Sequence, residues 1–241
     1  MIRTNNLSKR FGKGQALRSV TLAVAAGELL CIVGASGCGK STLLRLIAGF
    51  ERPDAGVVQI DSQLLSSPSK LVAPSRRGVG MVFQDLALWP HMSVRDNVAF
   101  GLQGKGAGRK GIAEQVQEAL RQVGLHDHIR RYPHQLSGGE RQRLAVARAL
   151  AAKPAYLLMD EPFSSLDWLV KEEMITLLSG LKRSLSMGVI YVTHDLGEVL
   201  DLADSVSIMH SGSILCSMAK EELSAMSRED LMAWYRDNAQ G

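Results

Sequence analysis

The sequence predicts an α/β fold with a mainly parallel sheet, and three observations support this prediction. First, short apolar runs rich in valine, isoleucine and leucine recur along the 241 residues. Most of them lack polar alternation, which indicates strands that are buried on both faces. Second, helical patterns separate several of these runs, as in layered α/β domains. Third, a glycine-rich segment at residues 34–42 follows one apolar run and opens a helix, which is typical of a phosphate-binding loop.

The individual elements of the core follow from these patterns. The helix expected over residues 41–48 places Leu43, Leu44 and Ile47 near one face, and residues 169–185 form a longer amphipathic pattern. The expected core strands are residues 29–33, 79–83, 156–159, 189–193 and 206–209. Antiparallel strands near turns are expected at residues 21–24, 57–60 and 213–216.

The middle of the chain differs, because it contains helical patterns and no convincing strand. Ser93 is a suitable N-cap for a helix over residues 93–101, and two further helices are expected at residues 112–123 and 139–151. A glycine-rich stretch at residues 104–111 predicts a mobile loop. These patterns predict a helical subdomain that is inserted into the α/β core.

We therefore expect a single domain over residues 1–241. Its α/β core, which includes an antiparallel β subdomain, comprises residues 1–87 and 154–218. The helical subdomain comprises residues 88–153, and a helical tail follows at residues 219–241.

The composition is that of a soluble globular protein, with 46% hydrophobic and 22% charged residues. No apolar run approaches the roughly 20 residues of a membrane helix, and the N-terminus lacks a signal-peptide pattern. We expect a cytoplasmic protein that reaches the membrane only through a partner. The net charge of +4 is dispersed and favours a mildly basic surface over an affinity for polyanions, so we expect no nucleic-acid partner. Three scattered cysteines argue against a disulfide framework or a zinc site.

The glycine-rich segment fits the P-loop pattern G-x-x-x-x-G-K-[ST]. Its glycines let backbone amides curl around phosphate oxygens, and the helix N-terminus adds its positive dipole end. Lys40 is expected to place an ammonium on the outer phosphates, and the Ser41 hydroxyl is expected to ligate Mg²⁺. The residues expected to form this loop are Gly34, Ala35, Ser36, Gly37, Cys38, Gly39, Lys40, Ser41 and Thr42.

Cys38 lies inside this loop and admits two interpretations. The favoured one is a small neutral filler. The other is a redox-sensitive thiol, whose thiolate the helix N-terminus would stabilise.

A second motif is an apolar strand that ends in the carboxylates Asp160 and Glu161. Strands often end in solvated acids, so this motif is weak alone and gains its meaning from the P-loop. In a Walker B arrangement, Asp160 holds Mg²⁺ through its water shell, and Glu161 is placed to polarise the attacking water.

A third motif decides among the families that share the first two. The segment Leu136-Ser-Gly-Gly-Glu140 precedes a helix and exposes backbone amides at its N-terminus, which forms a second anion site. This segment resembles the LSGGQ signature of the ABC ATPase family. The simpler alternative is an ordinary helix start with Ser137 as the N-cap.

The resemblance extends over about residues 2 to 218 and implies further roles. Gln84 resembles the Q-loop glutamine that reaches the metal and the attacking water, and His194 resembles the switch histidine at the γ-phosphate. Residues 164–167 resemble the D-loop, and Phe11 sits where the family places a ring on adenine. A lone glutamine or histidine at a strand end is usually structural, and the less favoured alternative for Phe11 is a place in the core.

The resemblance also implies a head-to-tail dimer, which we expect to be a homodimer, with each ATP between the P-loop of one subunit and the signature of the other. The cofactors are then ATP and Mg²⁺. The expected catalytic residues are Lys40, Gln84, Glu161 and His194. The expected metal ligands are Ser41, Gln84 and Asp160. The nucleotide contacts outside the P-loop are expected at Phe11, Ser137, Gly138, Gly139, Glu140 and Asp167.

Transport follows from the same resemblance. In the family, transmembrane permease subunits dock near the Q-loop, where this chain carries Trp89 and Met92 beside Pro90. Both side chains could equally belong to the subdomain core. The sequence around Gln84 resembles bacterial importers for ferric iron, polyamines, sulfate and sugars, so we expect an importer of small ions or polyamine-like solutes. A solute-binding protein outside the membrane would then take part indirectly.

Three other functions are alternatives to an importer ATPase. An exporter subunit is opposed only by the segment near Gln84. Non-transport ABC ATPases usually carry two cassettes, long coiled coils or zinc inserts, which this chain lacks. A P-loop kinase is disfavoured by the signature, and a GTPase by the absence of Asn-Lys-x-Asp. Because many related importers carry a β-rich regulatory domain after the core, we expect regulation by such a domain to be missing here.

Overall fold

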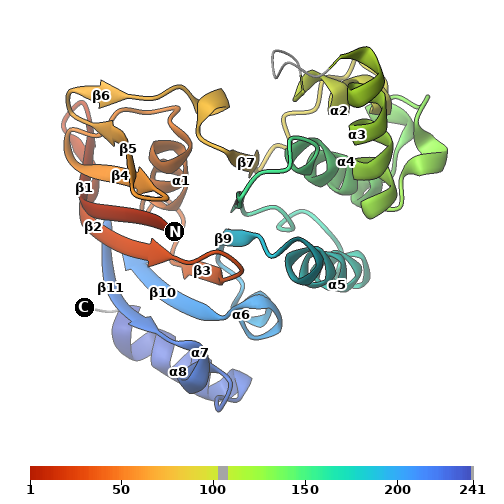
Figure 1. The fold of residues 1–241 in the computed structure, drawn as a ribbon. Coiled ribbons are helices and arrows are strands. Elements are labelled where there is room, and N and C mark those ends of the chain that lie inside the picture. Colours follow the sequence, from red (N-terminus) through yellow and green to blue (C-terminus); the bar gives the residue numbers. More distant parts are fainter. Residues whose placement is uncertain (103–107, 240–241) are drawn as a thin grey trace.

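The computed structural model describes residues 1–102 and 108–239 and contains two sheets with helices around them (Figure 1). Residues 104–107 of the expected glycine-rich loop lie outside these described residues, whereas residues 109–111 begin the helix Arg109–Gln122 instead of forming a loop. This α/β architecture, with a mainly parallel sheet and a separate antiparallel sheet, confirms the predicted fold class. None of the helices in residues 1–102 and 108–239 combines the length and the hydrophobicity of a membrane-spanning segment.

The larger sheet is the centre of the molecule and has the order β11-β10-β3-β9-β8-β7. Neighbouring strands are parallel from β10 to β7, and β11 is antiparallel to β10. All residues of β3, β8 and β9 are buried, which explains why their sequences lack polar alternation. The strands are β3 Leu29–Val33, β7 Val79–Val82, β8 Tyr156–Asp160, β9 Gly188–Thr193, β10 Ser205–His210 and β11 Ser213–Met218. The five predicted core strands all lie in this sheet.

The smaller sheet is antiparallel and has the order β2-β1-β4-β5-β6. The strand β1, at the start of the chain, was not predicted. Register shifts between Thr4 and Leu7 and further along β1 break the alternation of buried and exposed residues that identifies a strand. Asn6 within this irregular part has a left-handed backbone, with φ of 49°. The strands are β1 Ile2–Phe11, β2 Gly14–Val24, β4 Ala55–Ile60, β5 Gln63–Ser67 and β6 Lys70–Leu71.

The regular structure between β7 and β8 is entirely helical in the described residues, and Figure 1 places it on the side away from the antiparallel sheet. We retain residues 88–153 as a proposed subdomain. Its elements are α2 Val94–Phe100, α3 Arg109–Gln122, α4 Gly138–Leu150 and the short turns η2 His126–His128 and η3 Pro133–Gln135. The helices outside this segment are α1 Lys40–Ala48, α5 Trp168–Leu185, α6 Leu196–Leu202, α7 Lys220–Leu223 and α8 Arg228–Ala239, with a 3-10 turn at Pro74–Arg76.

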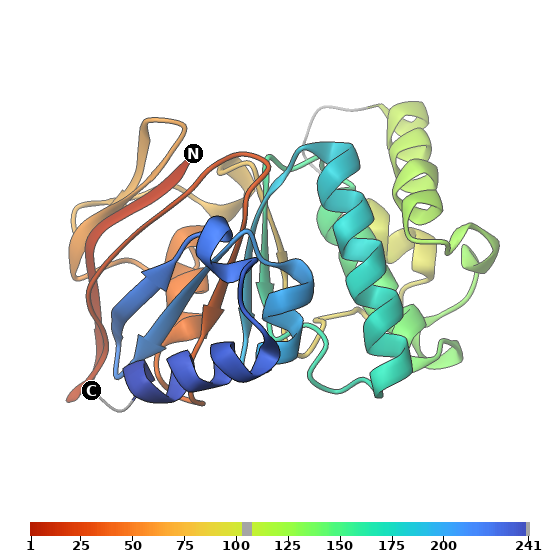
Figure 2. The same cartoon turned by 90° about the horizontal axis from the view of Figure 1, so that it is seen from below.

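The parallel sheet separates two hydrophobic cores. Successive residues of β3 alternate between them: Cys31 belongs to the core on the side of α2 to α6, whereas Ile32 belongs to the core around α1 and the antiparallel sheet. Figure 2 shows α8 along the outside of the strands near the C-terminus, where Leu231 is fully buried. Packing on both faces fixes the sheet, and with it the positions of its strand ends.

Candidate nucleotide-binding site

Four neighbouring strand ends form the candidate site. The strands β3, β9, β8 and β7 are parallel, so their carboxyl ends meet at one edge of the sheet. The glycine-rich loop follows β3, and His194 directly follows β9. Asp160 ends β8 with Glu161 next to it, and Gln84 comes two residues after β7. Open α/β sheets bind ligands at this edge, and the sequence places its polar motifs there.

The loop after β3 needs its glycines for packing as well as for ligand access. A side chain at Gly34 would collide with the carbonyl of Met209 and with the Cys38 sulfur. Gly39 has φ of 113°, and a Cβ there would lie 2.5 Å from the carbonyl oxygen of Ala16. Only glycine can adopt this positive φ and also avoid the clash with Ala16, so residue 39 must be glycine. The loop therefore enters α1 tightly, with the N-terminal amides of that helix facing the site.

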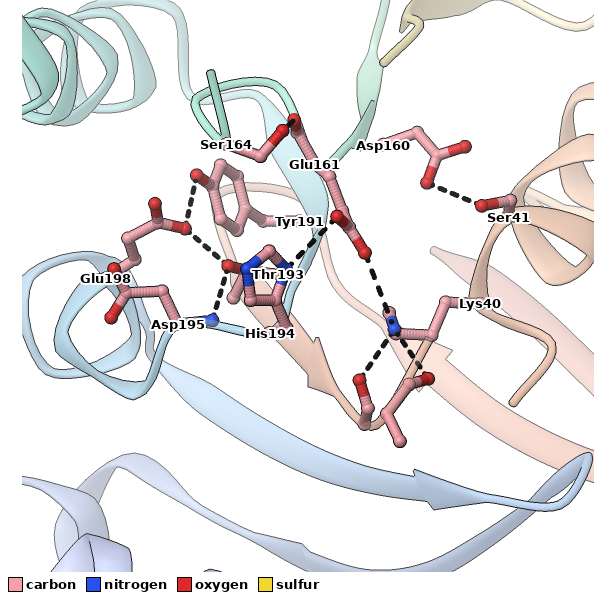
Figure 3. Close-up of polar contacts among 12 residues, drawn as sticks. Lys40, Ser41, Asp160, Glu161, Ser164, Tyr191, Thr193, His194, Asp195 and Glu198 are labelled. Atoms are coloured by element: carbon pink, nitrogen blue, oxygen red, sulfur yellow. Dashed lines mark hydrogen bonds and ion pairs between the residues drawn. The ribbon is translucent and has the colours of Figure 1, made fainter. Parts of the chain in front are cut away.

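Lys40 is held inside this loop. Its side chain is only 4% exposed, and its Nζ donates hydrogen bonds to the carbonyl oxygens of Gly34 at 2.7 Å and Ala35 at 3.1 Å. The same nitrogen lies 3.6 Å from Oε1 of Glu161. The ammonium is thus fixed between the loop and the end of β8 (Figure 3). A buried cation in this position can offset charge on a bound phosphate.

Ser41 and Asp160 bring two oxygen atoms together across the site. The Ser41 hydroxyl donates a hydrogen bond of 2.9 Å to Oδ1 of Asp160. Burial raises the pKa of Asp160, and the hydrogen bond from Ser41 counteracts part of that effect. Hydroxyl and carboxylate oxygens suit Mg²⁺, which usually keeps waters and phosphate oxygens as its other ligands. The donor set fits a magnesium ion that is held jointly with a nucleotide.

Glu161 and His194 meet at the adjacent strand ends. Nδ1 of His194 lies 3.1 Å from Oε2 of Glu161. Glu161 adopts a left-handed backbone with φ of 43°, which is uncommon for a residue with a side chain. Its amide donates to the carbonyl of Val192 at 3.0 Å, and its carbonyl accepts a hydrogen bond of 3.0 Å from the Ser164 hydroxyl. These two contacts hold the strained turn and aim the carboxylate into the site (Figure 3).

A hollow of about 230 Å³ lies at these strand ends, and a second one of about 510 Å³ adjoins it. Both are lined by Ser41 and Gln84, so Gln84 borders the same space as the residue whose hydroxyl meets Asp160. The first hollow is lined by Ala16, Ser36, Gly37, Gly39, Lys40, Ser41, Thr42, Gln84 and Glu161. The second hollow is lined by Ser41, Arg45, Phe83, Gln84, Asp85, Ala87 and Asp160.

The predicted signature residues lie at the start of α4 and do not line either hollow. Ser137 and Glu140 form a reciprocal cap: the Ser137 amide donates to Oε2 of Glu140 at 2.7 Å, and the Glu140 amide donates to the Ser137 hydroxyl at 3.2 Å. The hydrogen bond from the Ser137 amide lowers the pKa of Glu140. A Cβ at Gly139 would lie 2.7 Å from Val170 of α5, so this glycine permits close helix packing. The chain's own P-loop and signature are therefore separate sites.

Two other predicted contacts also lie outside the hollows. Phe11 ends β1 with half of its surface exposed, and Lys9 Nζ lies 5.2 Å from the centre of its ring. The exposure favours a ring that is free to stack over the alternative of a core phenylalanine. Asp167 accepts a hydrogen bond of 3.1 Å from the Val170 amide and caps α5. Both remain proposed nucleotide contacts.

The hypothesis that the loop favours the thiolate of Cys38 is wrong, because the pKa of this thiol is raised and not lowered. Burial raises the pKa of this thiol, and the nearby charge of Lys40 lowers it by less. The thiol therefore stays protonated near neutral pH, which agrees with the filler interpretation. Cys38 belongs to a hydrophobic core that also contains Met209, a residue far along the chain, so its burial cannot be read from the loop itself.

Trp89 is exposed rather than part of a core, with 41% of its surface accessible. It packs edge-on against Phe100, with ring centres 5.5 Å apart. The turn that carries it is organised by Asn97, a fully buried residue of α2 whose amide group bonds the Trp89 backbone and the Met92 carbonyl. Asn97 was not predicted as a functional residue, although a polar residue in the otherwise apolar stripe of a helix is a signal that the sequence contains.

Comparison with known proteins assigns a family. Residues 17–164 match the model of the family described as ABC transporter. The chain is 46% identical over 223 residues to the spermidine/putrescine import ATP-binding protein PotA of Chromobacterium violaceum. It is 45% identical over 208 residues to the sulfate/thiosulfate import ATP-binding protein CysA 2 of the same organism. The matches cover 92% and 86% of this chain but only 61% and 56% of those relatives, so the chain spans about three fifths of their length.

Solved structures agree with this match. The chain resembles the dimeric structure of a bacterial ABC transporter cassette with a TM-score of 0.80 and 31% identity, covering 91% of this chain and 99% of the other. A post-hydrolysis state bound to ADP and Pi matches with a TM-score of 0.80, 30% identity and the same coverage.

Proposed function

Because the chain belongs to the ABC transporter family, we propose that it binds ATP with Mg²⁺ and hydrolyses it to drive import of a solute. The observation that carries this proposal is the meeting of Lys40, Glu161 and His194 at neighbouring strand ends, next to the Ser41–Asp160 pair. These are the groups that phosphoryl transfer to water requires: a cation, a water-orienting carboxylate and oxygen ligands for a metal.

The proposed mechanism assigns one task to each side chain. Glu161 orients the attacking water and accepts its proton, and His194 holds Glu161 and contacts the γ-phosphate. Lys40 moves part of its hydrogen bonding from the loop carbonyls to phosphate oxygens and offsets the charge that develops there. Bound Mg²⁺, held by Ser41, Asp160 and Gln84, would neutralise phosphate charge. Phe11 would stack on the adenine.

The second part of the proposal is a composite site in a head-to-tail dimer. Residues 137–140 and Asp167 lie outside the chain's own hollow, so they are available to an ATP held by a second copy. The similar solved cassette is dimeric, which supports this arrangement. ATP between the two copies would hold them closed, and hydrolysis would release them.

The test of hydrolysis and dimerisation uses the purified chain with ATP and Mg²⁺. We expect activity that rises more than linearly with protein concentration and that Ser137→Arg abolishes. Ser93→Arg is the matched control, because Ser93 likewise caps a helix, accepting a hydrogen bond from the Asp96 amide at the start of α2, and lines neither hollow. Activity that stays linear with concentration and survives Ser137→Arg would overturn the composite site. A wild-type chain without ATPase activity would overturn hydrolysis itself.

We further propose that the chain works at the cytoplasmic face of a membrane, bound to permease subunits at the exposed turn around Trp89. The two relatives import a polyamine and an inorganic anion respectively, which favours import over export and leaves the solute to the partners. Polyamine is the first solute to test. Loss of putrescine uptake, with sulfate uptake unchanged, after deletion of the gene would support it; the reverse pattern would assign an anion.

A further inference from the structure

A buried carboxylate lies behind the candidate site and has no role in the mechanism above. Glu198 of α6 is only 3% exposed and does not line either hollow. Its Oε2 accepts hydrogen bonds from the hydroxyls of Tyr191 at 2.8 Å and Thr193 at 2.5 Å. Burying a charge is costly unless it is paired, so this cluster needs a cation.

That cation is Lys171 of α5. Its Nζ lies 3.0 Å from Oε1 of Glu198 and 2.9 Å from Oδ2 of Asp195. Burial alone would lower the pKa of Lys171, but its hydrogen bonds to Asp195 and Glu198 outweigh this effect and raise the pKa. One ammonium thus joins two carboxylates from the segment that follows β9 (Figure 3 shows the two acids).

The residues directly before and after His194 both belong to this network. Thr193, directly before it, donates to Glu198 and accepts a hydrogen bond of 3.0 Å from the Asp195 amide. Asp195, directly after it, caps α6 by accepting a hydrogen bond of 2.8 Å from the Gly197 amide. The backbone of His194 is therefore fixed on both sides, while its ring reaches Glu161.

The other end of the network lies beside the proposed dimer contacts. Lys171 is one helical turn after Asp167, the N-cap of α5 in the segment that resembles the D-loop. The first turn of α5 also carries Val170, against which Gly139 of the signature packs closely. Lys171 therefore connects two turns. One is the first turn of α5, which follows the D-loop segment and packs against the signature, and the other is the turn that carries His194.

We propose that Lys171, Asp195 and Glu198 are positioning residues for His194, and that they tie its turn to the first turn of α5. This inference rests on the proposed ATP hydrolysis. The network acts only through the placement of His194 against Glu161 and the γ-phosphate. Its loss slows hydrolysis and leaves ATP binding at the P-loop intact, because the P-loop contacts do not involve it.

The first experiment compares kcat and KM of the purified full chain for wild type, Lys171→Met and Lys171→Arg. Misplacing a catalytic group costs roughly ten- to hundredfold in rate, so we expect kcat of Lys171→Met to fall by about that factor, with an unchanged KM. Arginine keeps the charge and should restore most of kcat. Lys182→Met is the matched control: Lys182 lies on the same helix, is also mostly buried and pairs with Asp204 instead of with Asp195 or Glu198. It should keep the wild-type kcat.

A double mutant separates positioning from general destabilisation. If Lys171 acts through His194, then Lys171→Met adds no further loss to a chain that already carries His194→Ala. If the double mutant instead shows the product of the two single-mutant losses in kcat, the inference is overturned. A wild-type kcat in Lys171→Met would overturn it as well. Should Lys171→Met fail to fold, Glu198→Gln removes the charge at constant size and must show the same fall in kcat at unchanged KM. A wild-type chain without hydrolysis would overturn both this inference and the proposed function.

Discussion

Nδ1 of His194 lies 3.1 Å from one carboxylate oxygen of Glu161, and Nζ of Lys40 lies 3.6 Å from the other. One carboxylate is therefore held from both sides, by the residue that follows β9 and by the first residue of α1. The pairing of β8 with β9, in which Asp160 lies opposite Val192, brings Glu161 and His194 together. Their relative position is set by the sheet rather than by a loop.

Glu161→Gln should keep ATP binding and lose turnover. The amide preserves the shape of the side chain but cannot accept a proton from water, and a general base contributes about 100-fold or more to a rate. We expect kcat to fall by at least about 100-fold. The Kd for ATP should stay within about threefold of wild type, which corresponds to a change of less than about 1 kcal/mol in the binding free energy. A glutamine variant with a normal rate would remove Glu161 from the mechanism.

Trp89→Ala should weaken association with permease subunits more than it changes ATP affinity. The indole is exposed and packs on Phe100 at the surface, so its loss removes apolar contact area without opening a core. Leu215→Ala is the control, because Leu215 is a similarly exposed apolar residue on β11. Recovery of the chain with detergent-solubilised permease measures the effect. Equal losses in Trp89→Ala and Leu215→Ala would place the docking surface elsewhere.

Modification of Cys38 by a thiol reagent should be slow at neutral pH and accelerate as the solution becomes alkaline. The thiolate is the reacting form, and burial raises the pKa of this thiol, so little thiolate exists near pH 7. Mass spectrometry of the labelled peptide between pH 7 and 10 follows the rate. Rapid labelling at pH 7 would contradict the buried, protonated thiol and revive the redox hypothesis.

Asp204→Asn should reduce stability at neutral pH, and the loss should shrink in acid. Asp204 accepts hydrogen bonds from Lys182, from Lys220 and from the Leu29 amide. Burial alone would raise its pKa, but the bonds from Lys182 and Lys220 lower it overall. A depressed folded-state pKa gives stability that is present above the unfolded value of about 4 and is lost as pH falls through the folded value.

We therefore expect Asp204→Asn to lose roughly 1.5–3 kcal/mol of unfolding free energy at pH 7, the range for hydrogen bonds to a charged group. The difference from wild type should shrink once the pH falls below about 4. Urea unfolding at several pH values measures both quantities. A constant difference at all pH values would show that packing, and not the charge of Asp204, stabilises this region.

The parallel strands and their terminal residues could be predicted because both depend on local sequence. Residues 29–33 match β3 in full, since a strand buried on both faces must be apolar throughout. Asp160 and His194 were identifiable because parallel strands bring their carboxyl ends to one edge. By contrast, β1 was hidden by its irregular pairing, and the Lys171–Glu198 pair joins residues 27 positions apart without any periodic pattern.

The adjacency of β3, β9, β8 and β7 also determines where the chain tolerates changes in length. One residue inserted into any of these strands would shift the following site residue by about 3.3 Å and turn its side chain to the opposite face of the sheet. An insertion in the connections between strands would leave those end points in place. The spacing between motifs along the chain is therefore free to vary among relatives, whereas the short distance from each strand to its polar residue is not. Circular permutants opened in a surface connection should keep the site, while single-residue insertions in β8 or β9 should destroy it.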